Sequence, residues 1–158
     1  MSSDRQHTGI IINGAGPIGM LMAISLRQYQ QSVTLIGPEA NKNPAMTFAI
    51  KEINLKFLQE LGINLEHGTA KSMHLTSNDQ TIRLHAKTSG KNILFATISY
   101  NQLLYHCQKR IDELNIPWIK EKPLQFDHQK IITSQGDIQA PLYIAADGAK
   151  SWLRSHTN

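Results

Sequence analysis

Apolar residues recur with two different spacings in the first part of the chain. Residues 10–13 and 33–36 are short, almost continuous apolar or β-branched runs, and each leads into a glycine. Such runs are typical of strands that are buried on both faces of a parallel sheet. Between them, apolar residues recur at helical spacing behind Pro17, at Ile18, Leu21, Met22, Ile24 and Leu26. Because proline suits the first turn of a helix, the pattern predicts a strand–helix–strand unit with a right-handed crossover.

A second helix and a hairpin are predicted in the next stretch. A loop is expected at residues 41–44. After it, apolar residues recur with helical spacing, and Gly62 is expected to end this helix. These residues are Ile50, Ile53, Phe57, Leu58 and Leu61. Residues 71–76 and 81–87 then have the pattern of two antiparallel strands around the polar tetrapeptide 77–80. The middle of the chain therefore differs from its start, where parallel strands are expected.

A third helix is predicted to begin beside Ser99. Ser99 and Gln102 have the spacing of a capping box, in which two side chains satisfy free N–H groups at the helix start. Pro117 ends this helix, which places one apolar row at Leu103, Leu104, Cys107, Ile111 and Leu114. Short strands are expected afterwards, at 118–120, 131–134 and 142–146. These elements predict an α/β fold with a parallel sheet and a small antiparallel β segment, in one domain over residues 1–158.

Composition narrows the class of protein. Of 158 residues, 41% are apolar and 18% are charged, which is ordinary for a globular domain. The 16 Lys and Arg residues give a net charge of +4 but are scattered, without the basic stripe and interleaved aromatic residues of a nucleic-acid surface. We therefore expect no nucleic-acid partner, and at most weak attraction to anionic lipid or anionic ligands.

Cysteine use and the N-terminal residues indicate the compartment. Cys107 is the only cysteine of the sequence, which excludes a disulfide framework and a cysteine metal site and fits a reducing compartment. Its position on the apolar side of a helix predicts a core residue. Residues 1–7 lack the apolar stretch of a secretory signal, and residues 18–26 are too short to span a bilayer. The expected location is the cytoplasm.

The histidines give no strong metal signal. None of the seven shows HxH or HExxH spacing. His74 and His85 are a pair that the predicted hairpin can bring face to face, but a protein metal site takes three or four ligands. We therefore expect no metal.

The turn after the first strand is the first motif that carries chemistry. It reads Gly14-Ala15-Gly16-Pro17-Ile18-Gly19. Gly14 allows a tight turn, Gly16 allows a pyrophosphate to approach the backbone, and Gly19 allows close packing of helix on strand. The helix N-terminus then offers N–H groups and a positive dipole to phosphates. Because the motif lies between a strand and a helix, it predicts a Rossmann-like dinucleotide site, with a turn that only packs as the alternative.

The next residue of such a site is an acid at the end of the second strand, where it binds the adenosine ribose hydroxyls. Gly37 occupies that position and is not acidic. Glu39 follows two residues later, after Pro38. Glu39 can reach back toward the ribose, or it is a solvated loop residue, and the sequence leaves both interpretations open.

A second motif follows the last predicted strand and suggests a family. It reads Asp147-Gly148-Ala149-Lys150-Ser151-Trp152-Leu153-Arg154. Together with the Gly-rich turn, with Met46-Thr47-Phe48-Ala49-Ile50 and with residues 58–62, it resembles flavin-dependent aromatic hydroxylases of the p-hydroxybenzoate hydroxylase type. The likeness is strongest to their ubiquinone-biosynthesis branch, and it covers almost the whole chain.

This resemblance implies a cofactor and a reaction. In such proteins FAD, reduced by NAD(P)H, activates oxygen for the hydroxylation of an aromatic ring, here of a quinone precursor. The Asp-Gly motif is associated with both nucleotides. Asp147 can anchor its loop or accept from a ribityl or ribose hydroxyl, and Gly148 allows the turn. Ser151 can cap the helix that follows, and Arg154 can pair with Asp147 or a phosphate, unless both residues only hold the loop.

Further features complete the comparison with these hydroxylases. Gln102 begins a helix where the family has polar groups near the flavin pyrophosphate. Met46 stands where the family often has an arginine against the flavin, and Gly37 replaces the acid. The sequence also lacks the later segment in which the family carries a second Gly-Asp motif and the sheet that covers the substrate. We therefore expect the N-terminal portion of an FAD/NAD(P)-binding domain, without the part that binds the flavin ring and substrate.

Two other functions remain as alternatives. The chain is a non-catalytic or degenerate module that binds the ADP half of a dinucleotide, or it is part of another flavin enzyme, such as a halogenase or a geranylgeranyl-type reductase. The expected partners are an aromatic small molecule and a second copy, because apolar faces without a cover favour self-association. Peripheral attachment to the inner face of the membrane, or to a biosynthetic complex, is an alternative to a free cytoplasmic protein.

Overall fold

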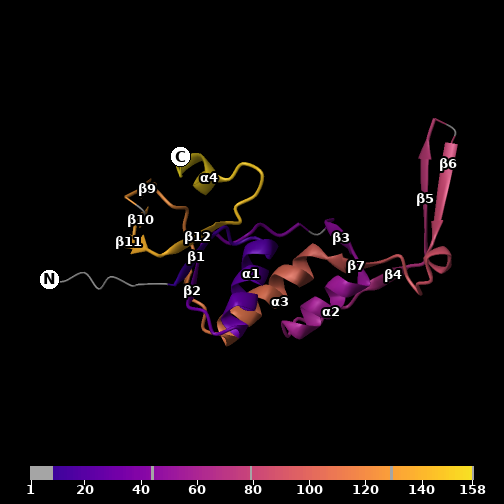
Figure 1. The fold of residues 1–158 in the computed structure, drawn as a ribbon, viewed down its shortest axis with the longest axis horizontal. Helices are drawn as coiled ribbons and strands as arrows, with labels where there is room; N and C mark the ends of the chain where they lie inside the picture. Colours follow the sequence, from indigo (N-terminus) through magenta and orange to yellow (C-terminus); the bar gives the residue numbers. More distant parts are fainter. Residues whose placement is uncertain (1–8, 44, 79, 129, 158) are drawn as a thin grey trace. The chain divides into compact units, whose positions relative to one another are not determined.

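The computed structural model describes residues 9–43, 45–78, 80–128 and 130–157. They form two compact units, which are treated separately below (Figure 1). The first unit runs to Asn41 and resumes at Cys107, and the second is Lys42–His106. Three predicted features fall partly or wholly outside the described residues, namely the N-terminal segment 1–7, Pro44 in the expected loop, and Asp79 in the expected hairpin turn.

A parallel four-stranded sheet is the centre of the first unit. Its strand order is β12-β1-β2-β8, and every neighbouring pair is parallel. The strands are β1 (Ile10–Asn13), β2 (Val33–Ile36), β8 (Trp118–Ile119) and β12 (Leu142–Ala145). All four residues of β2 are buried, as are three of the four in β1, which confirms the expected buried strands. Helix α1 (Pro17–Gln28) connects them and starts at the predicted proline.

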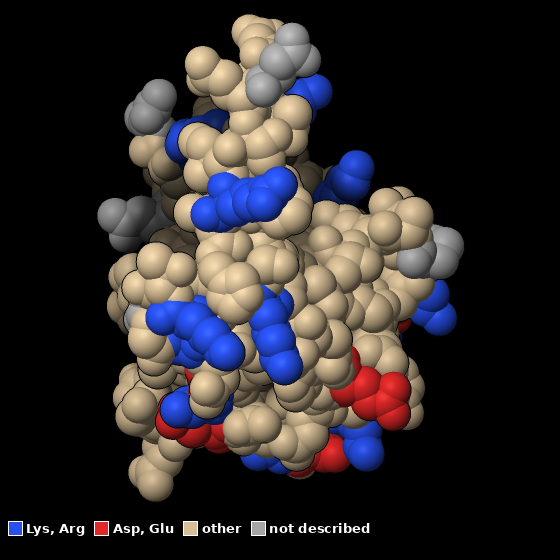
Figure 2. Space-filling model, turned by 90° about the vertical axis from the view of Figure 1, so that its right-hand side faces the viewer, with Lys and Arg blue, Asp and Glu red and all other residues tan. Residues whose placement is uncertain are grey.

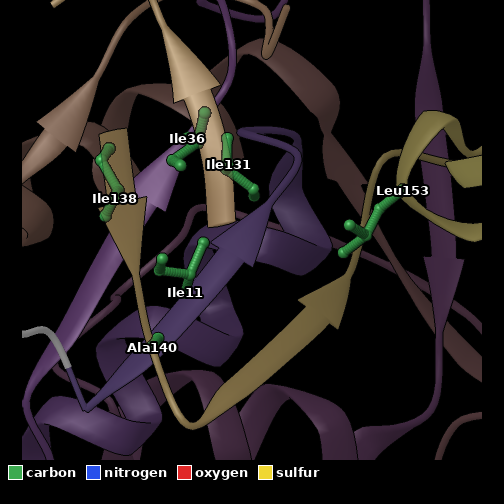
Figure 3. Packing of buried hydrophobic residues seen from close by; sticks show 6 residues of the cluster. All are labelled: Ile11, Ile36, Ile131, Ile138, Ala140 and Leu153. Atoms are coloured by element: carbon green, nitrogen blue, oxygen red, sulfur yellow. The ribbon is translucent and has the colours of Figure 1, made fainter. Parts of the chain in front are cut away.

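A small antiparallel sheet packs into the same unit. It consists of β9 (Gln125–Asp127), β10 (Lys130–Thr133) and β11 (Gly136–Gln139), in the order β11-β10-β9. Ile131 and Ile138 from this sheet meet Ile11 and Ile36 from the parallel sheet, together with Leu153 of α4 (Trp152–His156) (Figure 3). The predicted strand at 131–134 is confirmed. Strands β9 and β11 have polar, turn-rich sequences and were not predicted.

The second unit is built on an antiparallel sheet, helix α2 (Glu52–Glu60) and the part of helix α3 (Tyr100–Glu113) up to His106. Strand β7 (Phe95–Ser99) lies between β3 (Thr47–Ile50) and β4 (Gly68–Ala70). Helix α2 ends with Gly62 at a φ of 79°, as the glycine stop predicts, and α3 begins beside Ser99. The prediction that Ile50 belongs to α2 is wrong. Ile50 is the last residue of β3, where it pairs with Ala96 of β7.

The hairpin of β5 (Ser72–Ser77) and β6 (Gln80–His85) confirms the two predicted strands. A 3-10 turn, η1 (Ala86–Ser89), follows it. The register places Ser72 opposite His85 and His74 opposite Arg83, so the face-to-face His74–His85 arrangement that the hairpin allowed does not occur. Within the described residues no group of three or more His, Cys, Asp or Glu side chains is arranged to hold a metal ion.

Charge and burial agree with the sequence pattern. Figure 2 shows Lys and Arg side chains spread over the displayed face rather than gathered in one stripe. Cys107 is fully buried on α3, and burial raises the pKa of its thiol to about 12, so it is a core residue as predicted. None of the helices in the described part of the chain has the length and apolar character needed to cross a membrane.

Candidate functional site

A cleft of about 710 Å³ opens at the carboxyl ends of the parallel strands. Its walls come from the ends of β1, β2 and β12, from residues 13–18, 37–41 and 146–148, with further contributions from 122–123, Lys150 and Trp152. All of these residues belong to the first unit. Strand β1 has β2 on one side and β12 on the other. The cleft therefore lies at the switch point of the parallel sheet, where the strands that follow β1 are added on opposite sides of it. Ligands of open α/β sheets bind at this kind of position.

Two glycines of the first motif are required by the packing of the fold itself. Gly14 has a φ of +119°, and a Cβ there would lie 2.4 Å from the backbone carbonyl of Ala146. A Cβ on Gly19 would lie 1.8 Å from the carbonyl oxygen of Gly14. No side chain fits at such distances. These two glycines therefore bring α1, β1 and the end of β12 close together, as the motif predicts for Gly19.

Gly16 is different, because no other atom occupies the space beside it. A Cβ there would have nothing within 4 Å, and the residue has an ordinary extended conformation at the N-cap of α1. Ala15, Pro17 and Ile18 flank it on the cleft wall, with the Ile18 side chain 68% exposed. The fold does not need a glycine at this position. The free space beside a helix N-terminus is what a phosphate group needs for close approach.

The space beside Gly37, at the end of β2, is too small for a side chain. Its φ is +142°, and a Cβ would lie 2.9 Å from the backbone nitrogen of Ala15. Glu39, two residues further, lies on the cleft wall. There its Oε1 accepts a hydrogen bond from Nζ of Lys120 at 2.6 Å. The side chain is 55% exposed, so a role of Glu39 toward a ribose stays a prediction.

Asp147 is the best-connected side chain at the cleft. Its carboxylate accepts from Nδ2 of Asn13 at 2.9 Å, from Oγ of Ser151 at 2.5 Å, and from the backbone N–H groups of Trp152 at 2.6 Å and Leu153 at 3.3 Å. Partial burial raises the pKa of this carboxyl, but the hydrogen bonds from Ser151 and the backbone outweigh burial and hold the pKa below its ordinary value. Asp147 thus joins the ends of β1 and β12 to α4.

Ser151 and Arg154 hold the loop that carries Asp147. Oγ of Ser151 accepts from the N–H of Arg154 at 3.2 Å, which confirms Ser151 as the N-cap of α4. Nη2 of Arg154 donates to the carbonyl oxygen of Ala149 at 2.7 Å, which fits the alternative in which Arg154 holds the loop, and a phosphate partner stays a prediction. Gly148, with a φ of +86°, makes the turn and lies on the cleft wall.

Replacing Ser151 with alanine is expected to destabilise the first unit by about 1 kcal/mol, the usual cost of removing a serine N-cap. The variant also loses the hydroxyl that donates to Asp147. Urea denaturation followed by circular dichroism measures the change. Ser155→Ala is the matched control, because the bonds of the Ser155 hydroxyl to described residues stay within α4, to the carbonyl of Trp152 and to His156. An equal decrease in the free energy of unfolding in the two variants would contradict the capping role of Ser151.

Gln102 and Met46 belong to the second unit, whereas the described residues that line the cleft belong to the first. The backbone N–H of Gln102 donates to Oγ of Ser99 at 3.5 Å, which is the serine half of the predicted capping box. Sequence reasoning missed Asn13, a buried amide that directly precedes Gly14 and bonds Asp147. The signal that identifies it is a polar residue at the end of an otherwise apolar strand.

Comparison with known proteins gives the family. The profile of the pyridine nucleotide-disulphide oxidoreductase family matches residues 9–90, just over half of the chain. The chain belongs to this family. A search of curated protein sequences found no significant match.

Solved structures resemble a longer part of the chain than the family profile matches. The chain is similar to p-nitrophenol 4-monooxygenase PnpA from Pseudomonas putida DLL-E4, with a TM-score of 0.74 and 17% identity over 94% of this chain and 42% of that one. It is also similar to 2-methyl-3-hydroxypyridine-5-carboxylic acid oxygenase (TM-score 0.72, 16% identity, 92% and 41%). A third is P. aeruginosa PqsL in complex with 2-aminobenzoylacetate (TM-score 0.70, 16% identity, 94% and 45%).

These likenesses confirm the expected α/β, Rossmann-like fold with a parallel sheet. The chain spans less than half of the length of each of these three structures. Two of the three are named as oxygenases that act on aromatic rings. At 16–17% identity the similarity establishes the shared fold, and the family match establishes membership of an oxidoreductase family.

Proposed function

We propose that this chain is the FAD-binding portion of an NAD(P)H-using flavin monooxygenase that hydroxylates an aromatic ring, in the substrate class of ubiquinone precursors. Three observations support the proposal. The family is one of nucleotide-dependent oxidoreductases. Proteins with the same fold include aromatic-ring monooxygenases. The cleft combines a glycine turn at a helix N-terminus with an acid at the end of a neighbouring strand.

The residues of the cleft fit an FAD molecule. The first turn of α1, with Gly16 at its start, is placed to receive the pyrophosphate. Lys122 and Lys150 lie on the cleft wall, and neither has a carboxylate partner within the described residues, so both ammonium groups are available to phosphates. Asp147 holds the loop of Gly148 in place through its four bonds. When bound, the flavin would supply the redox chemistry, and the protein would supply position and charge.

The observation that carries the proposal is the unoccupied space beside Gly16. The packing of Gly14 and Gly19 explains why these residues are glycines, but no contact among the described residues explains Gly16. A ligand group that approaches the backbone at the start of α1 does explain it. Because a pyrophosphate is the ligand that this geometry suits, the glycine turn favours a dinucleotide over a purely structural role.

Replacing Gly16 with valine is expected to abolish FAD retention without unfolding the protein. The extended conformation of Gly16 suits a β-branched residue before proline, and the new methyl groups would enter the cleft rather than the core. The purified chain is incubated with FAD and desalted, and the flavin absorbance is compared with that of wild type, alongside the melting temperature. The valine variant is expected to retain less than about a tenth of the flavin, since a blocked phosphate approach costs more than 1.4 kcal/mol.

Thr69→Val is the control, because it places the same valine side chain at an exposed position in the second unit, outside the cleft. It is expected to leave both flavin retention and melting temperature unchanged. Equal flavin retention by wild type and Gly16→Val would overturn the dinucleotide assignment. A colourless wild type that takes up no FAD would overturn the flavin assignment.

A nucleotide-binding module without catalysis is the second candidate. It is favoured by the cleft itself, whose lining offers a helix N-terminus and lysines for a nucleotide. Binding of ADP without NAD(P)H consumption in the presence of FAD and an aromatic acid would support this candidate over the complete reaction.

Self-association is part of the proposal for the partners. Leu75, Ile82 and Leu84 are 41–61% exposed on the β5–β6 hairpin, and two-stranded hairpins are marginal without a covering layer. One of the similar structures is described as a tetrameric form of 2-methyl-3-hydroxypyridine-5-carboxylic acid oxygenase. Attachment to the inner face of the membrane or to a biosynthetic complex stays a prediction from the family resemblance.

A further inference from the structure

The end of β2 presents an unusual arrangement for a dinucleotide site. An acid at this strand end ordinarily binds the ribose hydroxyls. Here the residue is Gly37, and its backbone lies so close to Ala15 that a Cβ would be 2.9 Å from the Ala15 nitrogen. The carbonyl of Gly37 accepts from the indole N–H of Trp118 at 2.8 Å, and its N–H donates to Ile119 at 2.9 Å. This position is therefore closed to any acidic side chain.

Glu39 is the nearest acid after this closed position, and the residue that follows β8 binds its carboxylate. Strand β8 pairs with β2 in parallel, with Ile36 opposite Ile119, which brings the residue after Ile119 beside the end of β2. That residue is Lys120. Its Nζ donates to Oε1 of Glu39 at 2.6 Å and lies 4.7 Å from the centre of the Trp118 ring, within the range of a cation–π contact.

The fold gains little stability from this ion pair. The side chains of Lys120 and Glu39 are 57% and 55% exposed, and pairs exposed to that degree contribute little to folding. Yet the lysine is fixed at two points, by the carboxylate and by the indole ring, while Glu39 lies on the cleft wall. An arrangement that orders an acid at the cleft without stabilising the fold points to a role in binding.

We propose that Glu39 binds the adenosine ribose diol in place of the missing strand-end acid, and that Lys120, supported by Trp118, is its positioning residue. This inference rests on the dinucleotide function proposed above and adds a specificity to it. A carboxylate accepts hydrogen bonds from both hydroxyls of an unmodified ribose and repels a 2′-phosphate. The Glu39–Lys120 pair therefore selects nucleotides with a free 2′-hydroxyl.

The test is isothermal titration calorimetry of the whole chain with ADP, 2′-deoxy-ADP and 2′,5′-ADP. Wild type is expected to prefer ADP over 2′-deoxy-ADP by about tenfold, since hydrogen bonds to a charged acceptor are worth that much or more. Glu39→Ala is expected to bring this ratio to about one. The same variant is expected to bind 2′,5′-ADP about tenfold better than wild type, because Lys120 then lacks its carboxylate partner.

Lys120→Met tests the positioning role. It is expected to lower the ratio of ADP to 2′-deoxy-ADP affinity by about threefold or more with an unchanged melting temperature, and Lys120→Arg is expected to restore the ratio, because arginine also pairs and stacks. Lys122→Met is the matched control. Lys122 also lies on the cleft wall, so its loss is expected to weaken the binding of ADP and of 2′-deoxy-ADP equally. The ratio of the two affinities is then unchanged.

The outcomes separate this inference from the proposed function. If ADP binds wild type and Gly16→Val abolishes the binding, while Glu39→Ala leaves the ratio unchanged, the role of Glu39 and Lys120 is overturned and the dinucleotide site stands. If ADP does not bind wild type at all, the proposed function is overturned and the ribose assignment with it. A fall in the ratio for Glu39→Ala and Lys120→Met, but not for Lys122→Met, supports both.

Discussion

Replacing Gly19 with alanine is expected to lower the free energy of unfolding by roughly 3 kcal/mol or more, which places it among the severe single substitutions. The added Cβ would lie 1.8 Å from the carbonyl oxygen of Gly14, a backbone atom that cannot rotate away. Alanine in a helix interior ordinarily gains about 1 kcal/mol over glycine. The steric clash must therefore exceed a favourable change in helix propensity, and the sign of the result tests the packing directly. Urea denaturation followed by circular dichroism measures it.

Gly16→Ala is the matched control, three residues away on the same turn. Its Cβ would have no neighbour within 4 Å, so the unfolding free energy is expected to change by less than about 0.5 kcal/mol. Similar losses of stability in the two variants would mean that the motif acts through local backbone preference alone. A large loss for Gly19→Ala only would separate the glycine that packs from the glycine that faces the cleft.

The parallel part of the fold could be predicted because its signals are local. Strands β1 and β2 are continuous apolar runs, and α1 begins at Pro17, so each element is recognised from its own residues. The β5–β6 hairpin follows from alternation around a polar turn, which is also local. In these segments propensity, burial and topology agree, which is the condition for a reliable prediction.

Long-range pairing explains what the sequence did not predict. Ile50 and Ile53 have helical spacing, but Ile50 pairs with Ala96 of β7, and this contact places it in a strand. Strands β9 and β11 contain mostly polar residues and form because β10 lies between them. Strand propensity depends on such neighbours more than helix propensity does.

The candidate site was predicted as a set of motifs but not as a set of contacts. The glycine turn and the Asp147 motif meet at one cleft, as their positions after parallel strands suggest. The bond from Lys120 to Glu39 joins residues 81 positions apart, and no spacing rule indicates it. For Arg154 the sequence left open whether it pairs with Asp147, pairs with a phosphate or only holds the loop, and its guanidinium bonds the Ala149 carbonyl of its own loop. A charged side chain can pair with any suitable group that the fold brings near it, so the sequence alone does not identify its partner.

Replacing Asp147 with asparagine is expected to lower the free energy of unfolding at neutral pH by about 3 kcal/mol, because hydrogen bonds to a charged acceptor are worth roughly 1.5–3 kcal/mol each. Four donors converge on this carboxylate, from Asn13, Ser151, Trp152 and Leu153. An asparagine can accept with one oxygen only, and its amide N–H groups would face donors. The first unit would therefore lose the link between β1 and α4.

The same variant tests the pKa of Asp147. The folded pKa lies below its ordinary value of about 4, so the carboxylate contributes stability above that pH, and the contribution is lost as the pH falls through the folded pKa. The stability difference between wild type and Asp147→Asn should thus be constant from pH 7 to about pH 5 and shrink below about pH 4. Asp112→Asn, at an exposed position of α3, removes a carboxylate without this network and should track wild type throughout. A difference between wild type and Asp147→Asn that stays constant down to pH values near 2 would show that the charge of Asp147 does not hold the loop.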